Sequence, residues 1–561
     1  MTAPISGAAP VLIAGAGPVG LCAGLHLANL GVPFMIFEED AGLSTEPKAG
    51  VLLPSSLELF SQVGVAEQIV GAGVRCGTID FLDRVSARVV NRMQVHELHT
   101  DTRYPMGLNL AQNDTERILR DAICARGLES ALHFDHRVTG VAQDDDGVTL
   151  QVATPDGSKE YPGSHLLGCD GGRGAVREAI GVTSTGRTYP ETFAVFNVEF
   201  DSPSADLVRA PGTFVFDPDE WMILVRLPGF WRVVWPQQPG RPPATEADLA
   251  ERLRFAFGRA EGFRIVGQAH YNVHHRYANR FRVGRTFLLG DAAHLVTPIG
   301  GLGLNTGLQD VNNLCWKLAK VINGAAGPGL LDSYERERLP IARFITGNMA
   351  DRNRDQLMLR APWKRLLRDV LMGAQIRSRR HRWQLAYSRS LLGISYRPPA
   401  ARPRRLRAAM SALRPDVPPA VAPGTFAPDG PLHWPDGHLR YLHDLLGRDL
   451  IALTFADARV QRDVPDLGVL PLRHYQISPM DIAPEAPLRA SLLVDLGGRV
   501  AARYRASAGT SYLLRPDGYV LDIAAAGQAP TSFRQALAAY LDLEHAQQAP
   551  SDAGSGIRSR R

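Results

Sequence analysis

Three glycines at a fixed spacing, set between an apolar run and a helical pattern, constrain the N-terminal fold of this chain most strongly. Gly15, Gly17 and Gly20 form G-x-G-x-x-G after the run 11–14 and before an apolar helical pattern over 21–30. Gly15 allows a tight turn, Gly17 lets the backbone approach a pyrophosphate, and Gly20 lets the helix pack against the strand. A second apolar run, 32–37, ends at Glu38, where a carboxylate can accept hydrogen bonds from ribose hydroxyls. The pattern predicts a Rossmann-like dinucleotide-binding unit.

Two further glycine motifs follow much later in the chain. One is Gly168-Cys169-Asp170-Gly171-Gly172, which follows a pattern typical of a strand. The other, 284–294, contains an apolar run that predicts a strand with Asp291 at its carboxyl end. The glycine loop 298–307 then opens a helix. An aspartate at such a strand end can bind a sugar-like polyol, and a helix N-terminus favours a polarised carbonyl or an anionic ring.

With these three motifs in this order, the chain resembles the class A flavoprotein aromatic hydroxylases, the FAD-dependent phenol and hydroxybenzoate monooxygenases. The resemblance covers about residues 10–390 and, more weakly, the C-terminal part. It implies an α/β protein: a Rossmann-like FAD-binding domain of the p-hydroxybenzoate hydroxylase type, an inserted β-sheet substrate domain and a C-terminal thioredoxin-like domain.

Carried over residue by residue, the resemblance implies an FAD site. Its first residues would hold the ADP half, Asp170 would serve both FAD and NAD(P)H, Asp291 would bind the ribityl chain, and the loop from Pro298 would lie against the isoalloxazine. The implied set is Gly15, Gly17, Pro18, Gly20, Glu38, Glu39, Lys48, Gln112, Asp170, Asp291, Pro298, Gly301, Gly303, Leu304 and Asn305. Two positions depart from the family: Gly174 replaces a usual serine, and Lys48 replaces a usual arginine, which offers a point charge in place of a bidentate fork.

The resemblance implies an enzyme that consumes NADH or NADPH and O2 and hydroxylates a small phenolic substrate through a flavin C4a-hydroperoxide. The alternatives are a flavin-dependent oxidoreductase without oxygen insertion, or a related halogenase. The Trp-x-Trp-x-x-Ile box expected of a halogenase is absent, because Trp231 and Trp235 are four positions apart. In a purely structural or binding protein, Asp170 and Asp291 would be ordinary strand-end caps.

The substrate base is not identified by the sequence. Candidate catalytic positions are Tyr271, His274, His275 and Pro298, since histidine titrates near neutral pH. The histidines could equally belong to a plain strand and turn that lead into the Asp291 motif. His294 is expected to be part of the motif's architecture.

Changes in composition and the positions of glycine- and proline-rich stretches divide the 561 residues into units. We expect an FAD-binding domain in two parts (10–190 and 276–395, the latter with helices), a mainly β substrate domain (191–275), a proline-rich linker (396–425), a thioredoxin-like domain (426–545) and a disordered tail (546–561). The last cysteine is Cys315, so the C-terminal unit has no thiol redox role. Its strands could bury an edge in a homodimer interface.

The five scattered cysteines predict reduced thiols, no metal site and a cytoplasmic location. No membrane span or secretory signal is expected. Residues 352–407 carry 16 Lys or Arg and two acids, which could bind nucleic acid. The helical spacing of leucines among these charges favours helices packed on acidic neighbours, so no nucleic-acid partner is expected.

Overall fold

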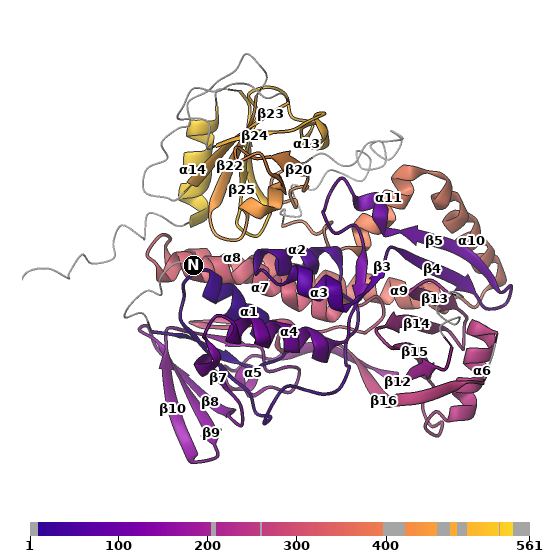
Figure 1. Cartoon of the computed structure of the whole chain (residues 1–561). Helices are drawn as coiled ribbons and strands as arrows, with labels where there is room; N and C mark the ends of the chain where they lie inside the picture. Colours follow the sequence, from indigo (N-terminus) through magenta and orange to yellow (C-terminus); the bar gives the residue numbers. More distant parts are fainter. Residues whose placement is uncertain are drawn as a thin grey trace, which may run out of the picture.

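The computed structural model describes residues 9–202, 209–258, 261–396, 421–456, 472–479, 491–526 and 528–541 (Figure 1). Most of the expected linker and the expected tail lie outside these residues. No helix among the described residues combines the length and apolarity that crossing a bilayer requires.

A six-stranded sheet carries the glycine motifs. Its order is β17-β18-β11-β1-β2-β7, and all neighbours are parallel except β17 and β18. The strands are β1 (Val11–Ala14), β2 (Phe34–Phe37), β7 (Leu132–His133), β11 (His165–Gly168), β17 (Arg282–Val283) and β18 (Thr286–Leu288). Because parallel strands end at one edge of a sheet, the three motifs meet there, which is where open α/β sheets bind ligands. The Rossmann-like prediction is confirmed.

Helices and smaller elements surround this sheet. They are α1 (Pro18–Asn29), α2 (Pro54–Gln62), α3 (Ala66–Ala72), α4 (Gln112–Cys124), α5 (Ala175–Ala179) and α7 (Leu302–Ile322), with short strands β3 (Val74–Cys76) and β6 (Gly107–Asn109). A three-stranded sheet of β8 (Arg137–Gln143), β9 (Val148–Thr154) and β10 (Gly157–Gly163) projects at the lower left of Figure 1.

The second large sheet has eight strands, in the order β19-β16-β12-β15-β14-β13-β4-β5. Its strands are β4 (Thr78–Asp83), β5 (Arg88–Gln94), β12 (Ser184–Phe200), β13 (Gly212–Phe216), β14 (Met222–Leu227), β15 (Phe230–Gln237), β16 (Phe263–Ala278) and β19 (His294–Leu295). This sheet extends beyond residues 191–275, the range expected for the β substrate domain. Strands β4 and β5 come from the expected first part of the FAD-binding domain, 10–190, and β4 joins the sheet by parallel pairing with β13. Trp231 and Trp235 are buried in a core shared with α6 (Glu246–Phe257), as sheet-core residues.

Four helices, α8 (Asp332–Phe344), α9 (Ala350–Leu357), α10 (Pro362–Arg377) and α11 (Arg379–Arg389), carry much of the basic segment. Its arginines pair with acids of the other elements: Arg354 with Glu191, Arg368 with Asp83 at 3.1 Å, and Arg382 with Glu97 at 2.7 Å. The prediction of acidic neighbours is confirmed. The apolar side chains of this segment differ in burial. Leu357, at the end of α9, is buried. Five apolar residues on α10 are exposed: Trp363, Leu366, Leu367, Val370 and Leu371.

The C-terminal unit contains a seven-stranded sheet in the order β21-β20-β24-β23-β22-β25-β26, with β22, β23 and β24 parallel. Its strands are β20 (Pro431–His433), β21 (Leu439–Tyr441), β22 (Leu450–Phe455), β23 (Leu472–Ser478), β24 (Leu492–Val494), β25 (Ser511–Leu514) and β26 (Val520–Ala524), with helices α13 (Arg499–Tyr504) and α14 (Ala529–Leu541). The thioredoxin-like assignment stays a prediction.

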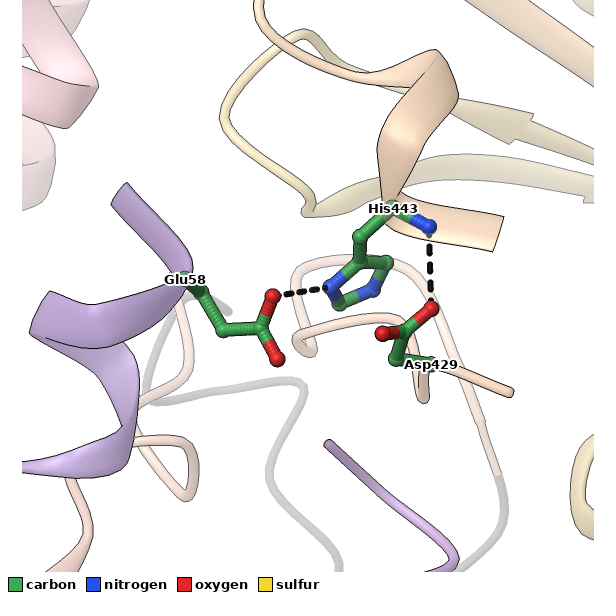
Figure 2. A group of neighbouring side chains, drawn as sticks. All are labelled: Glu58, Asp429 and His443. Atoms are coloured by element: carbon green, nitrogen blue, oxygen red, sulfur yellow. Dashed lines mark hydrogen bonds and ion pairs between the residues drawn. The ribbon is translucent and has the colours of Figure 1, made fainter. Parts of the chain in front are cut away.

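A buried polar cluster joins this unit to helix α2 (Figure 2). His443 places Nδ1 3.1 Å from a carboxylate oxygen of Glu58, on α2, and Nε2 2.9 Å from the carbonyl oxygen of Ala427. Both ring nitrogens therefore face acceptors, and the imidazolium form satisfies both. Asp429 accepts the backbone N–H of His443 at 2.9 Å. Burial opposes protonation of His443, but Asp429 and Glu58 outweigh it and raise the pKa to about 9.

Candidate active site

The turn after β1 has the geometry of a phosphate cradle. Gly15 has a φ of +97°, and a Cβ there would lie 2.5 Å from the Cys169 carbonyl oxygen. A Cβ on Gly20 would lie 2.0 Å from the Gly15 carbonyl oxygen, so both positions require glycine. A Cβ on Gly17 would meet no heavy atom within 4 Å, and Gly17 is the uncapped N-cap of α1, with Pro18 in its first turn. Open space before unpaired helix N–H groups suits a phosphate.

Glu38 is attached to the same turn. Its Oε2 accepts the backbone N–H of Ala16 at 2.6 Å, and its Oε1 accepts that of Asp40 at 3.3 Å. Glu39 follows as an exposed residue. The carboxylate that the sequence associates with ribose is thereby fixed beside the glycine turn.

Asp170 is half-buried, two residues after the end of β11, and its two carboxylate oxygens differ. Oδ2 accepts the Val176 N–H at 2.9 Å, whereas Oδ1 is buried without a hydrogen-bond partner. Burial raises the pKa of this carboxyl. A Cβ on Gly174 would lie 2.0 Å from Cγ of Asp170, so the observed position of Asp170 is compatible only with glycine at 174. Arg177 ties this motif to the next by donating to the carbonyls of Gly172 and Ala292.

Asp291 lines a polar hollow of about 770 Å³. Its side chain is exposed, yet burial within the surrounding protein raises its pKa, so it lies on the wall of a deep recess. Lys48 lines the same hollow. The loop of Lys48 is held by Gln112, whose Oε1 accepts the Ala49 N–H, and by the buried Arg232, which donates to the carbonyls of Pro47 and Lys48.

The loop 298–305 leads into the N-terminus of α7. Gly301, at φ +65°, is the N-cap of this 21-residue helix. Pro298 is exposed into a cavity, and Gly303 and Leu304 are half-buried in the first turn. The fully buried amide of Asn305 accepts hydrogen bonds from the Leu53 N–H and Ser56 Oγ and donates to the carbonyls of Val51 and Gly301. Because these four contacts use the amide fully, Asn305 positions the loop.

An apolar cavity of about 90 Å³ lies between this loop and the eight-stranded sheet. One part of its wall is Pro298, Gly300, Gly301 and Leu302, from the loop and the start of α7. The sheet contributes the aliphatic and aromatic side chains of Ile79, Phe81, Met93, Phe214, Ile223 and Val225. A mostly apolar cavity of this kind suits an aromatic ring.

The candidate catalytic residues separate into different places. Pro298 lines the apolar cavity, whereas Tyr271 and His274 line the polar hollow. His275 is buried with Nδ1 3.1 Å from the Tyr189 hydroxyl and lines neither space. Their catalytic role stays a prediction.

The sequence did not single out two residues that support the Asp291 motif. The buried Asp310 on α7 joins His294 Nε2 at 2.7 Å and Arg338 Nε at 2.7 Å, and it also accepts the Gly290 N–H. His294 is thus architecture, as expected. Asp310 and Arg338 could have been suspected only as charged residues on otherwise apolar helix faces.

The residues present fit FAD. The open cradle at Gly17, the unpartnered buried Oδ1 of Asp170 and the recessed carboxylate of Asp291 all lie at the carboxyl edge of one parallel sheet. An adenine dinucleotide needs a phosphate site, a ribose acceptor and a polyol acceptor in this arrangement.

Comparisons with known proteins agree with the geometry. The family model described as "FAD binding domain" matches residues 8–348. Para-nitrophenol 4-monooxygenase of Pseudomonas sp. (strain WBC-3) is 32% identical over 372 residues, which is 64% of this chain and 90% of that protein. The crystal structure of p-nitrophenol 4-monooxygenase from Pseudomonas putida DLL-E4 matches with a TM-score of 0.63 and 29% identity, covering 68% of this chain and 98% of that one.

A second solved structure extends the likeness to the C-terminal unit. The ternary complex of aklavinone-11 hydroxylase with FAD and aklavinone matches with a TM-score of 0.72 and 26% identity, covering 95% of this chain and 99% of that one. With the family model matching more than half of the chain, the conclusion is direct. This chain belongs to the family of FAD-dependent aromatic monooxygenases.

Proposed function

We propose that this FAD-dependent monooxygenase hydroxylates a phenolic ring held in the apolar cavity beside Pro298, with NADH or NADPH as the electron donor. The observation that carries the proposal is the shared wall: loop 298–302 and the sheet residues line one cavity. The resemblance to the family implies that the same loop would lie against the isoalloxazine. A ring in this cavity would therefore lie next to the oxidising face of the cofactor.

The protein's contribution is binding, orientation and exclusion of water. The turn at Gly17, Glu38 and Asp291 would hold FAD, and Asn305 holds the loop 298–302 against the segment of Leu53. FAD, when bound, supplies the electron transfer from NAD(P)H to O2 and the oxygen transfer to the ring. The apolar sheet residues keep the reacting atoms dry, which limits unproductive release of peroxide.

The polar hollow supports an entry side for the anionic nicotinamide cofactor. Among the described residues, its lining includes the cations Lys48, Arg173, Arg177 and Arg276 together with His270 and His274. Clustered cations in a concave surface attract phosphate groups. In this proposal His274 and Tyr271 serve the cofactor side, and Pro298 serves the substrate side.

The experiment is a panel of phenols tested for stimulation of NAD(P)H oxidation by the purified flavoprotein, with product masses determined. The expected result is a product heavier by one oxygen atom for a subset of phenols. NAD(P)H oxidation without any hydroxylated product across the panel would favour the oxidoreductase alternative.

A further inference from the structure

One charged side chain faces the apolar cavity. Arg389 is the last residue of α11, and it lines the cavity together with Phe81 and Phe214. Its guanidinium carbon lies 5.4 Å from the centroid of the Phe81 ring. Among the described residues that line this cavity, Arg389 alone carries a charge.

Arg389 differs from the neighbouring arginines in lacking an acidic partner. On the same helix Arg379 and Arg382 pair with Glu97, at 3.4 and 2.7 Å. The structure gives Arg389 no hydrogen bond or ion pair to a described residue; its recorded contact is with the Phe81 ring. Burial lowers its pKa to about 10, with no charge to offset it, so the guanidinium is still protonated at neutral pH.

Arg389 is half-buried, and a partly desolvated charge without a partner carries a cost that proteins offset with a counter-ion or with hydrogen bonds. The Phe81 ring offers a weak cation–π contact and no acceptor for the five N–H donors. The missing acceptor is therefore expected on the ligand. Pro298 and Arg389 line the same cavity, so a ring bound there would lie near both.

We propose that Arg389 is a specificity-determining residue that binds an anionic oxygen group of the aromatic substrate. This inference rests on the proposed function and adds the substrate class: a phenol that presents a carboxylate or its own phenolate oxygen to Arg389. The planar fork donates two parallel hydrogen bonds to a carboxylate and a charge-assisted one to a phenolate. The same contact orients the ring relative to the loop 298–302.

The test measures equilibrium binding to the holoenzyme through the perturbation of flavin absorbance, without turnover. Two probe pairs differ in the anionic oxygen: 4-hydroxybenzoate against 4-hydroxybenzamide, and p-nitrophenol against p-nitroanisole. The wild type is expected to bind the anion about 10- to 100-fold more tightly in at least one pair. The pair that shows the preference identifies carboxylate or phenolate as the recognised group.

Arg389→Gln is expected to abolish that preference, and Arg389→Lys to retain part of it because the charge remains. Arg379→Gln is the matched control, since it removes the same charge from the same helix at a side chain that is 65% exposed. Thermal midpoints of all variants separate loss of folding from loss of recognition. A wild type with no preference in either pair, or Arg389→Gln with the wild-type preference, would overturn the proposal.

These outcomes are separate from failure of the proposed function. If the anion preference depends on Arg389 but no probe or panel phenol gains oxygen, the site is an anion-binding aromatic site and the hydroxylation proposal fails. If phenols are hydroxylated with no dependence on Arg389 or on substrate charge, the hydroxylation proposal stands and the role of Arg389 fails.

Discussion

The side-chain amide of Asn305 accepts the backbone N–H of Leu53 at 2.8 Å, so a residue in the first turn of α7 fixes part of the wall of the apolar cavity. The same amide donates to the carbonyl of Gly301, in the loop expected to face the flavin. One buried side chain therefore connects the loop at Gly301 to the cavity wall at Leu53.

Replacing Asn305 with Ala tests this connection. The change removes four hydrogen bonds and leaves the Leu53 N–H and the Val51 carbonyl without their partner, at a cost of about 2–4 kcal/mol. We expect a lower thermal midpoint and a smaller yield of hydroxylated product per NAD(P)H oxidised. Asn323→Ala, at the other end of α7, is the control. An unchanged product yield in a folded Asn305→Ala variant would contradict the positioning role.

Replacing Asp291 with Ala tests the cofactor site. Loss of the recessed carboxylate would leave FAD hydroxyls without their acceptor, at about 1–3 kcal/mol, which corresponds to an affinity loss of about 5- to 150-fold. The measurement is release of FAD followed by fluorescence, with the exposed Asp156→Ala as control. Retention of FAD at wild-type affinity would remove Asp291 from the site.

Restoring the family's serine at position 174 is expected to damage this chain. A Cβ there would overlap the carboxyl of Asp170, with Cγ only 2.0 Å away, so Asp170 must move. Gly174→Ser should lower FAD affinity and the thermal midpoint, whereas Gly42→Ala, where a Cβ meets nothing within 4 Å, should change neither. Tight FAD binding by Gly174→Ser would show that the Asp170 position is not critical.

The protonated His443 is expected to make the stability of the contact between the C-terminal unit and α2 depend on pH. Its pKa of about 9 in the folded protein exceeds the ordinary value of 6.5, so its stabilising effect is complete below pH 6.5 and is lost as the pH rises through 9. His443→Gln should therefore be less stable than the wild type by about 2–4 kcal/mol at pH 6.5 and by much less at pH 10. Glu58, Asp429 and Arg103 face this cluster. Burial raises the pKa of both carboxyls and the charge of His443 lowers it, so the difference between the two pH profiles reports the titration of the whole cluster. Thermal midpoints at both pH values are the measurement; a constant difference between the proteins would contradict the assigned charge.

Substrate should control the consumption of NAD(P)H. Reduced flavin that meets O2 without a ring to oxidise releases peroxide, and the glycine-rich start of α7 suits a cofactor that changes position. We expect stimulation of NAD(P)H oxidation by at least about tenfold with an active phenol. Stopped-flow reduction at one rate with and without every active phenol would exclude this control.

The FAD site could be predicted from the sequence because its determinants are local. Glycine at positions 15 and 20 indicates that two backbone segments come close within the same turn. Glu38, Asp170 and Asp291 each follow the end of a strand, which puts them at one edge of the sheet. The resemblance placed Asn305 among the cofactor-binding residues, whereas in the structure its amide bonds to Leu53, Ser56, Val51 and Gly301. No local sequence pattern reveals these protein contacts.

The substrate side depends on contacts between distant segments. The pairing of β4 with β13 joins residues more than 130 positions apart, so β4 and β5 could not be assigned to the second sheet from the sequence. Four arginines occur in α11, and their sequence does not tell which one lacks an acid. That distinction depends on where Glu97 and the cavity lie relative to the helix, which is a property of the packed structure.

The central claim is that oxygen from O2 is inserted into a ring held beside loop 298–302. The direct measurement is turnover of an active phenol under ¹⁸O2 in ordinary water, followed by mass spectrometry of the product. The account predicts one ¹⁸O atom in the new hydroxyl group. A hydroxylated product whose new oxygen comes from water would contradict it.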